Sequence, residues 1–305
     1  MAGLLRRNQY DIAIIGAGAA GMTAAWHASQ RGLSTALFEA NLQPGGQVAT
    51  VGQIESMPGV ALSGPEFSAA LLSSARKGGA IFLPEEVLAV EEAHGGFILR
   101  HDSKFTLARQ VVLASGGAPR KLCVPGETQF EGRGVAHCAT CDGPLCRGRD
   151  VVVVGGGDAA LQEALLLANY ARLVTVVVRG QPRARRHFLD EAERLQNLKF
   201  VWNSTITEIV GTDGVEGVRL RHKDGTECEE QCFAVFVKVG CIPNTAVVKS
   251  LVDVDAMGFV CVDPFLQTRT KGLFAVGAVR TNYPGDLVGA AADGARVARA
   301  IGEVI

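Results

Sequence analysis

The residues best suited to redox chemistry are Cys138 and Cys141, which are separated by two residues and followed at once by Asp142. A CxxC pair beside a nucleotide-binding unit is typical of a dithiol that cycles with its disulfide. This spacing allows a bridge and lowers the pKa of one thiol, so that this thiol can act as a thiolate. A zinc site that joins the pair to Cys228 and Cys232 is the alternative. The second pair, however, has three intervening residues, unlike a zinc knuckle.

Two glycine-rich turns indicate a second kind of chemistry, the binding of dinucleotides. In such a turn the first glycine permits a tight bend, the second lets backbone N–H groups approach a pyrophosphate, and the third allows close packing of helix on strand. The helix that follows offers unpaired donors and a positive dipole end to the anion. A turn that binds nothing is the alternative, chiefly for the second copy. The turn residues are Gly16, Gly18 and Gly21 in the first copy and Gly155, Gly157 and Ala160 in the second.

The residue that closes the second strand of each unit indicates which nucleotide is bound. A carboxylate there bonds the ribose hydroxyls, so Glu39 marks the first site for FAD or NAD. In the second unit Arg179 occupies the matching place, so the second site lacks the carboxylate that an NAD site would have there. With Arg183 and Arg185 it predicts a clamp for the 2′-phosphate of NADPH, because guanidinium groups match phosphate geometry. A solvated basic helix start is the alternative.

The elements that must position these residues occur twice in the order strand, glycine turn, helix, strand. The first copy is expected at 11–15, a helix to about residue 30, and 34–38; the second at 151–154, a helix to about residue 170, and 174–178. Each half continues with a hairpin and an apolar strand. We expect a hairpin over 96–107, turning at 101–104, before a strand at 111–116. The second hairpin covers 215–232, turns at 224–225, and precedes a strand at 233–240. A strand at 272–277 and a helix at 287–301 complete the chain.

Composition sets limits on the class of protein. The chain has 305 residues, which favours about two domains. Its 30 basic and 31 acidic side chains argue against a nucleic-acid-binding protein. No apolar stretch approaches the ~20 residues of a membrane-spanning helix. Eight cysteines without a secretion signal predict reduced thiols and a cytoplasmic location. The six cysteines outside the CxxC pair are expected to be packed thiols.

The order of motifs resembles that of the low-molecular-weight thioredoxin reductase family, over essentially the whole chain. The resemblance lies in the CxxC-Asp-Gly run placed before the second glycine turn, in the 45–47 and 57–59 runs, and in Gly240 followed by 243–245. It implies an α/β fold of two Rossmann-like, three-layer ββα nucleotide-binding domains, the second inserted into the first. The FAD-binding domain would comprise 1–118 and 246–305. An NADPH-binding-like domain over 119–245 would contain the CxxC pair, and the protein would be a homodimer.

The resemblance also implies roles for individual residues. Electrons would pass from flavin through the disulfide to a thioredoxin-like protein, with Cys141 facing the flavin and Cys138 attacking the partner. Asp142 would protonate and deprotonate the thiols. The residues implied for FAD are Gly16, Gly18, Gly21, Glu39, Gly45, Gly46, Gln47, Ser56, Gly116, Gly277, Ala278 and Leu287.

Four departures from the family pattern leave the electron donor open. Gly180 stands where the nucleotide clamp has its second arginine, and the third arginine is recovered only by shifting the register. Ala278 replaces an aspartate of the C-terminal flavin motif, the 285–286 pair replaces Arg-Gln, and Ser56 replaces an asparagine. The donor is therefore NADPH, ferredoxin or another reductant. A dithiol oxidase that uses oxygen and a non-catalytic flavoprotein sensor are further alternatives.

Overall fold

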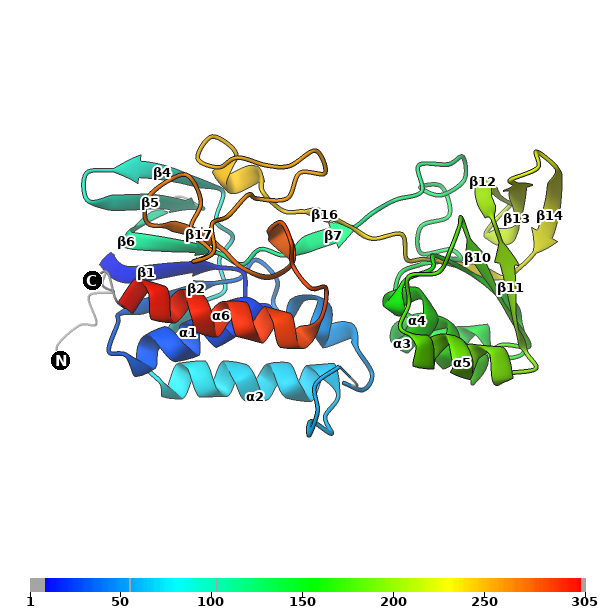
Figure 1. Cartoon of the computed structure of the whole chain (residues 1–305), viewed down its shortest axis with the longest axis horizontal. Helices are drawn as coiled ribbons and strands as arrows, with labels where there is room; N and C mark the ends of the chain where they lie inside the picture. Colours follow the sequence, from blue (N-terminus) through cyan, green and yellow to red (C-terminus); the bar gives the residue numbers. More distant parts are fainter. Residues whose placement is uncertain (1–8, 55, 103, 303–305) are drawn as a thin grey trace. The chain divides into compact units, whose positions relative to one another are not determined.

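The computed structural model describes residues 9–54, 56–102 and 104–302. The chain forms two compact units: unit 1 combines Met1–Ala118 with Ile242–Ile305, and unit 2 comprises Pro119–Cys241 (Figure 1). Where the chain passes from one unit to the other, β7 (Gly117–Pro119) pairs with β16 (Cys241–Pro243). Ser103 of the expected hairpin turn, and residues 1–8 and 303–305 of the expected FAD-binding domain, lie outside the described residues.

Unit 1 is built on a seven-stranded sheet in the order β3-β2-β1-β6-β5-β4, with β17 also paired to β6. Alternate residues of β1 serve its two faces: Ile12 and Ile14 pack under the helices, whereas Ala13 and Ile15 face the opposite core. The core strands run parallel, and β4 and β5 form an antiparallel hairpin on β6. The strands are β1 (Gln9–Ile15), β2 (Thr35–Phe38), β3 (Ile81–Leu83), β4 (Ala89–Ala93), β5 (Gly96–His101), β6 (Lys104–Leu113) and β17 (Leu273–Ala275).

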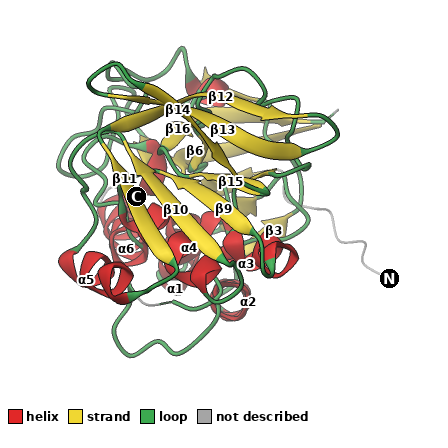
Figure 2. Cartoon of the chain, turned by 90° about the vertical axis from the view of Figure 1, so that its right-hand side faces the viewer, coloured by secondary structure: helices red, strands yellow, loops and turns green. Residues whose placement is uncertain are grey.

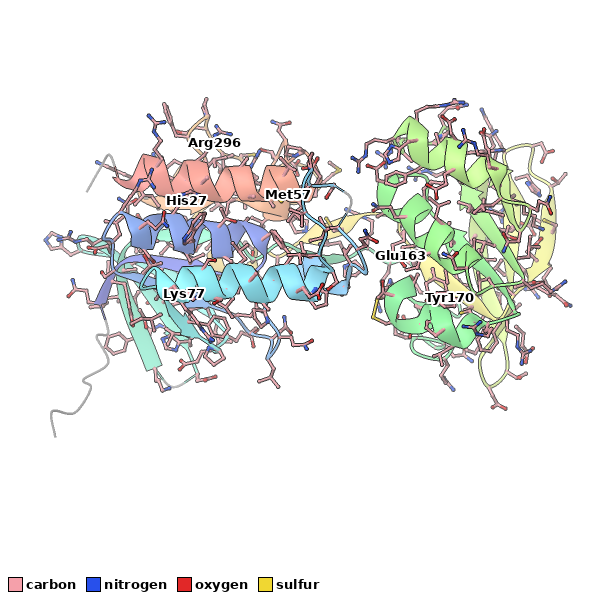
Figure 3. All side chains as sticks on the ribbon, turned by 90° about the horizontal axis from the view of Figure 1, so that it is seen from below. His27, Met57, Lys77, Glu163, Tyr170 and Arg296 are labelled. Carbon is pink, nitrogen blue, oxygen red and sulfur yellow. A yellow bond between two sulfur atoms is a disulfide. The ribbon has the colours of Figure 1, made fainter. Side chains whose placement is uncertain are left out.

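Helices α1, α2 and α6 lie side by side over one face of this sheet, and Figure 3 marks them with His27, Lys77 and Arg296 respectively. Small residues let α1 and α6 pack closely, since a Cβ on Gly294 would lie 2.4 Å from the Ala20 carbonyl oxygen. This contact holds the N-terminal end of α1 beside the C-terminal segment. The helices are α1 (Ala19–Gln30), α2 (Gly64–Lys77) and α6 (Leu287–Gly302), with short 3-10 turns η1 (Gly46–Thr50), η3 (Ala246–Val248) and η4 (Gly277–Val279).

One expected boundary in unit 1 is wrong. The sequence predicted a hairpin over 96–107 and a separate strand at 111–116, but β6 runs without a break over Lys104–Leu113. The first half of β6 pairs with β5, and the part of β6 from Leu107 to Leu113 pairs in register with β1. Because β1 supplies continuous hydrogen-bonding partners, the polar residues Arg109 and Gln110 do not end the strand.

Unit 2 repeats the pattern with three layers. A five-stranded parallel sheet in the order β11-β10-β9-β15-β8 has α3, α4 and α5 on one face and the sheet β12-β13-β14 on the other (Figure 2). Val151 and Val153 of β9 pack under the helices, whereas Val152 and Val154 pack under the smaller sheet. A run of valines is therefore buried on both faces.

The elements of unit 2 follow one another closely along the chain. The strands are β8 (Val135–Ala136), β9 (Asp150–Val154), β10 (Leu173–Val178), β11 (Leu198–Trp202), β12 (Ser204–Gly211), β13 (Val215–His222), β14 (Glu227–Gln231) and β15 (Ala234–Val237); the helices are α3 (Ala139–Asp142), η2 (Gly143–Cys146), α4 (Asp158–Ala168) and α5 (Arg186–Arg194). In the parts of the chain that the structure describes, none of the helices combines the length and the hydrophobicity of a membrane span.

Candidate functional site

Each glycine of the first glycine turn is present for a different physical reason. Gly16 has φ +105°, and a Cβ there would lie 2.4 Å from the Ala114 carbonyl oxygen. A Cβ on Gly21 would lie 1.9 Å from the Gly16 carbonyl oxygen, so this glycine permits α1 to approach the turn. Around Gly18, by contrast, a Cβ would meet no atom of the described chain within 4 Å beyond its neighbours. No side chain caps α1, so its first N–H groups have no side-chain acceptor.

Glu39 and the 45–46 pair surround the same turn. The buried Glu39 carboxylate accepts a hydrogen bond from the Ala17 amide at 2.8 Å and others from Asn41. The Gly45 amide donates to the Ala17 carbonyl at 2.8 Å, and a Cβ on Gly46 would lie 3.4 Å from the Gly18 Cα. Six of the expected FAD residues are thus gathered at one turn: Gly16, Gly18, Gly21, Glu39, Gly45 and Gly46.

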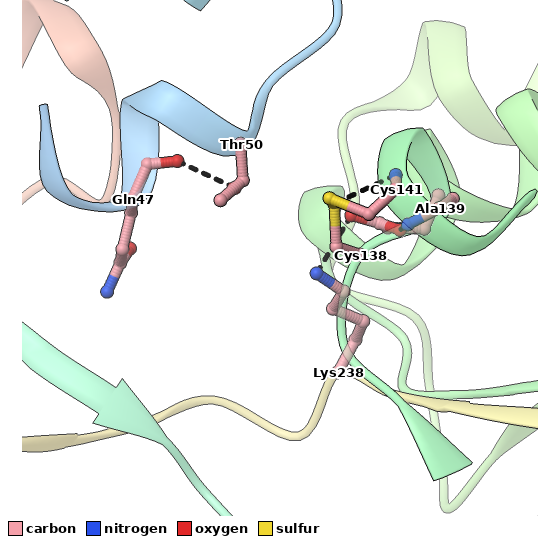
Figure 4. The surroundings of a disulfide bond; sticks show 7 residues. Gln47, Thr50, Cys138, Ala139, Cys141 and Lys238 are labelled. Atoms are coloured by element: carbon pink, nitrogen blue, oxygen red, sulfur yellow. Dashed lines mark hydrogen bonds and ion pairs between the residues drawn. A yellow bond between two sulfur atoms is a disulfide. The ribbon is translucent and has the colours of Figure 1, made fainter. Parts of the chain in front are cut away.

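Other expected FAD residues lie at the end of β6. Gly116 has φ +63° and open space where its Cβ would be. Asn244 holds this segment, because its backbone and side-chain N–H groups donate to the Gly116 and Ser115 carbonyls, both at 3.0 Å. The Gln47 side-chain amide donates to the Gly117 backbone carbonyl at 3.0 Å, and the Gln47 backbone carbonyl accepts a hydrogen bond from the Thr50 hydroxyl (Figure 4). Ser56 lies in the loop before α2 with no side-chain hydrogen bond to a described residue.

A buried ion pair that sequence reasoning missed fixes the C-terminal flavin motif. Arg280 and Asp293 form two hydrogen bonds of 2.7 and 2.8 Å, and Asp293 also accepts from the Gly277 amide at 2.9 Å. The side chains are 9% and 3% exposed, so removing one partner would leave a buried charge. The pair orients the turn that contains Ala278, while Leu287 is buried at the first position of α6.

The second glycine turn keeps the same geometry. A Cβ on Gly155, which has φ +143°, would lie 2.3 Å from the Lys238 carbonyl oxygen, whereas a Cβ on Gly157 would meet no non-neighbouring described atom within 4 Å. Ala160 is buried in the first turn of α4. No side chain caps this helix, but Asp158 places a carboxylate in its first turn. An anion bound here would face that charge unless it is neutralised.

Arg185 neutralises Asp158, which separates it from the other two arginines. The Asp158 carboxylate accepts from the Arg185 backbone amide at 2.7 Å and from its guanidinium at 2.6 Å. The Arg185 guanidinium also lies over the Phe188 ring. Arg179 and Arg183 are exposed, and neither side chain has a hydrogen bond or ion pair to a described residue. They are the arginines available to an anionic ligand.

The CxxC pair forms a disulfide in unit 2, with the two Cα atoms 5.4 Å apart. Cys138 is the N-cap of α3, and its sulfur accepts a hydrogen bond from the Cys141 amide at 3.2 Å. The half-buried Asp142 follows directly, and its carboxylate has no partner among the described residues. His137 is engaged elsewhere, since its ring nitrogens lie 3.3 Å from the Val237 carbonyl and 3.2 Å from Glu131.

Two charged residues that the sequence did not single out belong to the surroundings of this disulfide: Lys238, which is labelled in Figure 4, and Glu163, which bonds the residue after Cys138. The Glu163 carboxylate of α4 accepts a hydrogen bond from the amide of Ala139, the residue directly after Cys138. The second carboxylate oxygen of Glu163 pairs with the Lys238 ammonium at 2.8 Å. Both side chains are less than one-fifth exposed. Only tertiary structure brings them together, so no local sequence signal could have found them.

The zinc alternative finds no support in the described residues. There, no group of three or more histidine, cysteine or acidic side chains is arranged to hold a metal ion. The Cys228 sulfur lies 3.2 Å from a His222 ring nitrogen.

The expectation that the six cysteines outside the CxxC pair are packed thiols is wrong for three of them, since Cys123, Cys228 and Cys261 are exposed. Burial, with smaller contributions from nearby acids, raises the pKa of Cys232 to about 12. Burial and the nearby Asp142 raise the pKa of Cys146 to about 11.

Comparisons with known proteins place this architecture. A family model for pyridine nucleotide-disulphide oxidoreductases matches residues 10–294. Over 290 residues the chain is 38% identical to a thioredoxin reductase of Listeria monocytogenes, and this alignment covers 93% of this chain and 90% of the relative. This chain belongs to the thioredoxin reductase family.

Solved thioredoxin reductases share its fold. The Lactococcus lactis enzyme matches with a TM-score of 0.93 at 32% identity, covering 96% of this chain and 97% of that chain. The T. acidophilum enzyme matches with a TM-score of 0.93 at 29% identity, and the match covers 98% of this chain and 99% of that chain. The expected α/β fold with two Rossmann-like domains is therefore confirmed.

This thioredoxin reductase family member is a flavin-dependent disulfide oxidoreductase, and FAD is the family's cofactor. The first glycine turn fits that cofactor on its own geometry. A Cβ on Gly18 would meet no non-neighbouring described atom within 4 Å, no side chain caps the start of α1, and the residue that closes β2 is the acid Glu39, which are the features that a dinucleotide pyrophosphate and ribose would require.

Proposed function

We propose that this enzyme moves electrons from FAD to the Cys138–Cys141 disulfide, and from the resulting dithiol to a disulfide of a thioredoxin-like protein. The observation that supports this most is the CxxC bridge at the start of α3, directly followed by an acid with no described partner. When bound, FAD supplies a carrier of electron pairs. The named relatives are thioredoxin reductases, which favours thioredoxin as the partner. We also expect a homodimer.

The thiol steps follow ordinary disulfide exchange. In the reduced enzyme the Cys138 thiolate attacks one sulfur of the partner disulfide, forming a mixed disulfide and releasing the partner's other thiolate. Cys141 then loses its proton and attacks Cys138, which restores the enzyme bridge and releases the second partner thiolate. Counting the proton that Cys138 lost when it became a thiolate, the dithiol gives up two protons and two electrons, and the two partner thiolates take up the protons. Asp142 lies next to Cys141 and is the group that can hold these protons between steps.

For the electron donor we favour NADPH over a ferredoxin-like protein. The second turn retains open space over Gly157 and an uncapped helix end, as a pyrophosphate needs. Arg179 and Arg183 remain available for a 2′-phosphate, whereas Arg185 is committed to Asp158. The clamp therefore consists of two arginines from a rearranged run.

Substitution of the cysteines tests the catalytic route. Cys138→Ser is expected to abolish reduction of a thioredoxin disulfide while the flavin stays bound, as judged by its visible absorption. Cys141→Ser should stop electron flow from reduced flavin to any disulfide. Cys123→Ser, at an exposed cysteine outside the pair, is the matched control and should keep full activity. Unchanged turnover in Cys138→Ser would remove the dithiol from the route.

Anaerobic mixing with NADPH tests the donor. Rapid bleaching of the flavin absorption is the expected result. If NADPH fails while dithionite reduces the flavin normally, the donor is another molecule, and reduced ferredoxin is the next to assay. Oxygen uptake with a dithiol substrate would instead identify an oxidase, and a flavoprotein that reduces no disulfide with any donor would be a sensor.

A further inference from the structure

We propose that Lys238 and Glu163 are positioning residues that together set the acidity of the CxxC thiols. Glu163 holds the backbone of the α3 start in place, and Lys238 cancels the negative charge that this contact brings close to the reacting sulfurs. The inference rests on the proposed redox role of Cys138 and Cys141. It adds a device that controls the pH range in which that pair works.

The backbone contact explains why an acid is present. Ala139 is fully buried, and as the first residue of α3 its N–H group has no acceptor within that helix. A buried N–H group without an acceptor is costly. The Glu163 carboxylate, reaching over from α4, accepts this bond. The short helix that contains the redox pair is thus capped by a side chain of a neighbouring helix.

This capping brings an electrostatic problem with it. The acceptor is a carboxylate bonded to the amide directly after Cys138, in a region where its side chain is only 18% exposed. When the bridge opens, a thiolate forms in the same short turn. An uncompensated carboxylate so near would disfavour the thiolate and raise the thiol pKa.

Lys238 removes that problem. It follows β15, and its ammonium pairs with the free oxygen of Glu163 at 2.8 Å while its side chain is 19% exposed. The pair is neutral overall, so the turn keeps its cap without a net negative charge. Because both groups are largely removed from water, the cancellation is screened less than at the surface.

Other titratable groups around the bridge are accounted for. Asp142 is the acid to which we assign proton transfer, and His137 is bound to Glu131 and the Val237 carbonyl. Cys146 of η2 keeps its proton, because burial raises its pKa to about 11. None of these is the counter-charge of Glu163, a role that falls to Lys238.

The two members of the pair therefore have opposite effects on the thiols. Lys238→Met leaves Glu163 uncompensated and should raise the pKa of the attacking thiol. Glu163→Gln removes the carboxylate, leaves the Lys238 ammonium without its counter-charge, and should lower the pKa of that thiol. The rate of thiol alkylation below the midpoint should fall about three- to tenfold in the first variant and rise by a similar factor in the second, allowing for partial exposure of both groups. Simple structural damage would move both variants in the same direction.

The test measures alkylation of the full holoenzyme, anaerobically reduced with dithiothreitol, by iodoacetamide across a pH series. Tandem mass spectrometry distinguishes Cys138 from Cys141 and from Cys146. Lys238→Arg retains the charge and should keep the wild-type midpoint. Lys199→Met breaks a different ion pair of unit 2, that with Glu230 at 2.6 Å, and should also leave the midpoint unchanged.

The outcomes separate the inference from the function on which it rests. Opposite shifts in Lys238→Met and Glu163→Gln support the pair's role. Shifts in the same direction, or no shift while the wild type is reduced and alkylated normally, would overturn it without affecting the proposed redox centre. A wild-type bridge that dithiothreitol cannot open would overturn the redox centre itself, and the role of the pair with it.

Discussion

Residue identity alone does not decide what a basic side chain does in this enzyme. Arg183 and Arg185 lie two positions apart in one run, and the sequence offers both as phosphate ligands. The fold distinguishes them, because only Arg185 is paired with Asp158, through its guanidinium at 2.6 Å. The pairing depends on the path of the loop after β10, which returns to the glycine turn. There the Gly156 carbonyl accepts a hydrogen bond from the Arg183 backbone amide. That return could not be predicted from residue types.

The difference leads to a prediction about nucleotide choice. Arg183→Gln should raise the KM for NADPH by roughly tenfold and leave that for NADH nearly unchanged, because a hydrogen bond to a charged group is worth about 1.5–3 kcal/mol when it is not fully screened. Arg185→Gln is the matched control and should keep the NADPH-to-NADH preference. Steady-state kinetics with both nucleotides gives the comparison. An equal loss of preference in the two variants would show that the ion pair with Asp158 opens when nucleotide binds.

At the scale of secondary-structure elements, strand, glycine turn and helix follow from sequence because each has a local cause. The repeated pattern predicted β1, α1, β2, β9, α4 and β10 to within a few residues. The strands that were not predicted all lie at the edges of their sheets: β3, β4, β7, β8, β11, β12 and β16. Edge strands bury less of their surface, so their hydrophobic pattern is weaker. Their existence is decided by partners that lie far along the chain.

The glycines of the first turn provide a test of this local reasoning. Gly18→Ala should fold normally, because a Cβ there meets no non-neighbouring described atom within 4 Å. It should bind FAD poorly, because we expect the pyrophosphate to approach the backbone at this glycine. Gly21→Ala should lower the free energy of unfolding of the apoprotein by about 3 kcal/mol, as overpacking against backbone does. Urea unfolding of the apoprotein and flavin fluorescence during titration measure the two effects. Normal FAD affinity in Gly18→Ala would place the cofactor elsewhere.

The site shows the same limit as the fold. The CxxC pair, the two glycine turns and Glu39 could be predicted because each is a local pattern with a known chemical reason. The pairs Arg280–Asp293 and Glu163–Lys238 could not, since their members belong to different elements. Long-range ion pairs form where packing brings opposite charges together, and a single sequence contains no record of that.

For the whole molecule, buried thiols link stability to pH. Burial raises the pKa of Cys232 from 9.0 to about 12 in the folded protein. Between these values the unfolded chain loses the proton and the folded chain keeps it, so stability is full below about pH 9 and falls as the pH rises. The free energy of unfolding should drop by up to about 1.4 kcal/mol per pH unit through this thiol.

Replacing Cys232 should remove the part of the pH dependence of the free energy of unfolding that this thiol causes. In urea unfolding across pH 8 to about pH 11, Cys232→Ala should lose less stability with rising pH than the wild type. Cys261→Ala, at an exposed cysteine, is the control and should keep the wild-type slope. Equal slopes in all three proteins would mean that Cys232 ionises as freely when folded as when unfolded.

An anaerobic dithionite titration of the holoenzyme, followed by flavin absorption, decides whether electrons pass between the flavin and the disulfide. If flavin and the Cys138–Cys141 bridge exchange electrons, the wild type should take up twice as many electron equivalents as Cys138→Ser before reduction is complete. Equal uptake by the two proteins would show that the disulfide receives nothing from the flavin, and would contradict the proposed route.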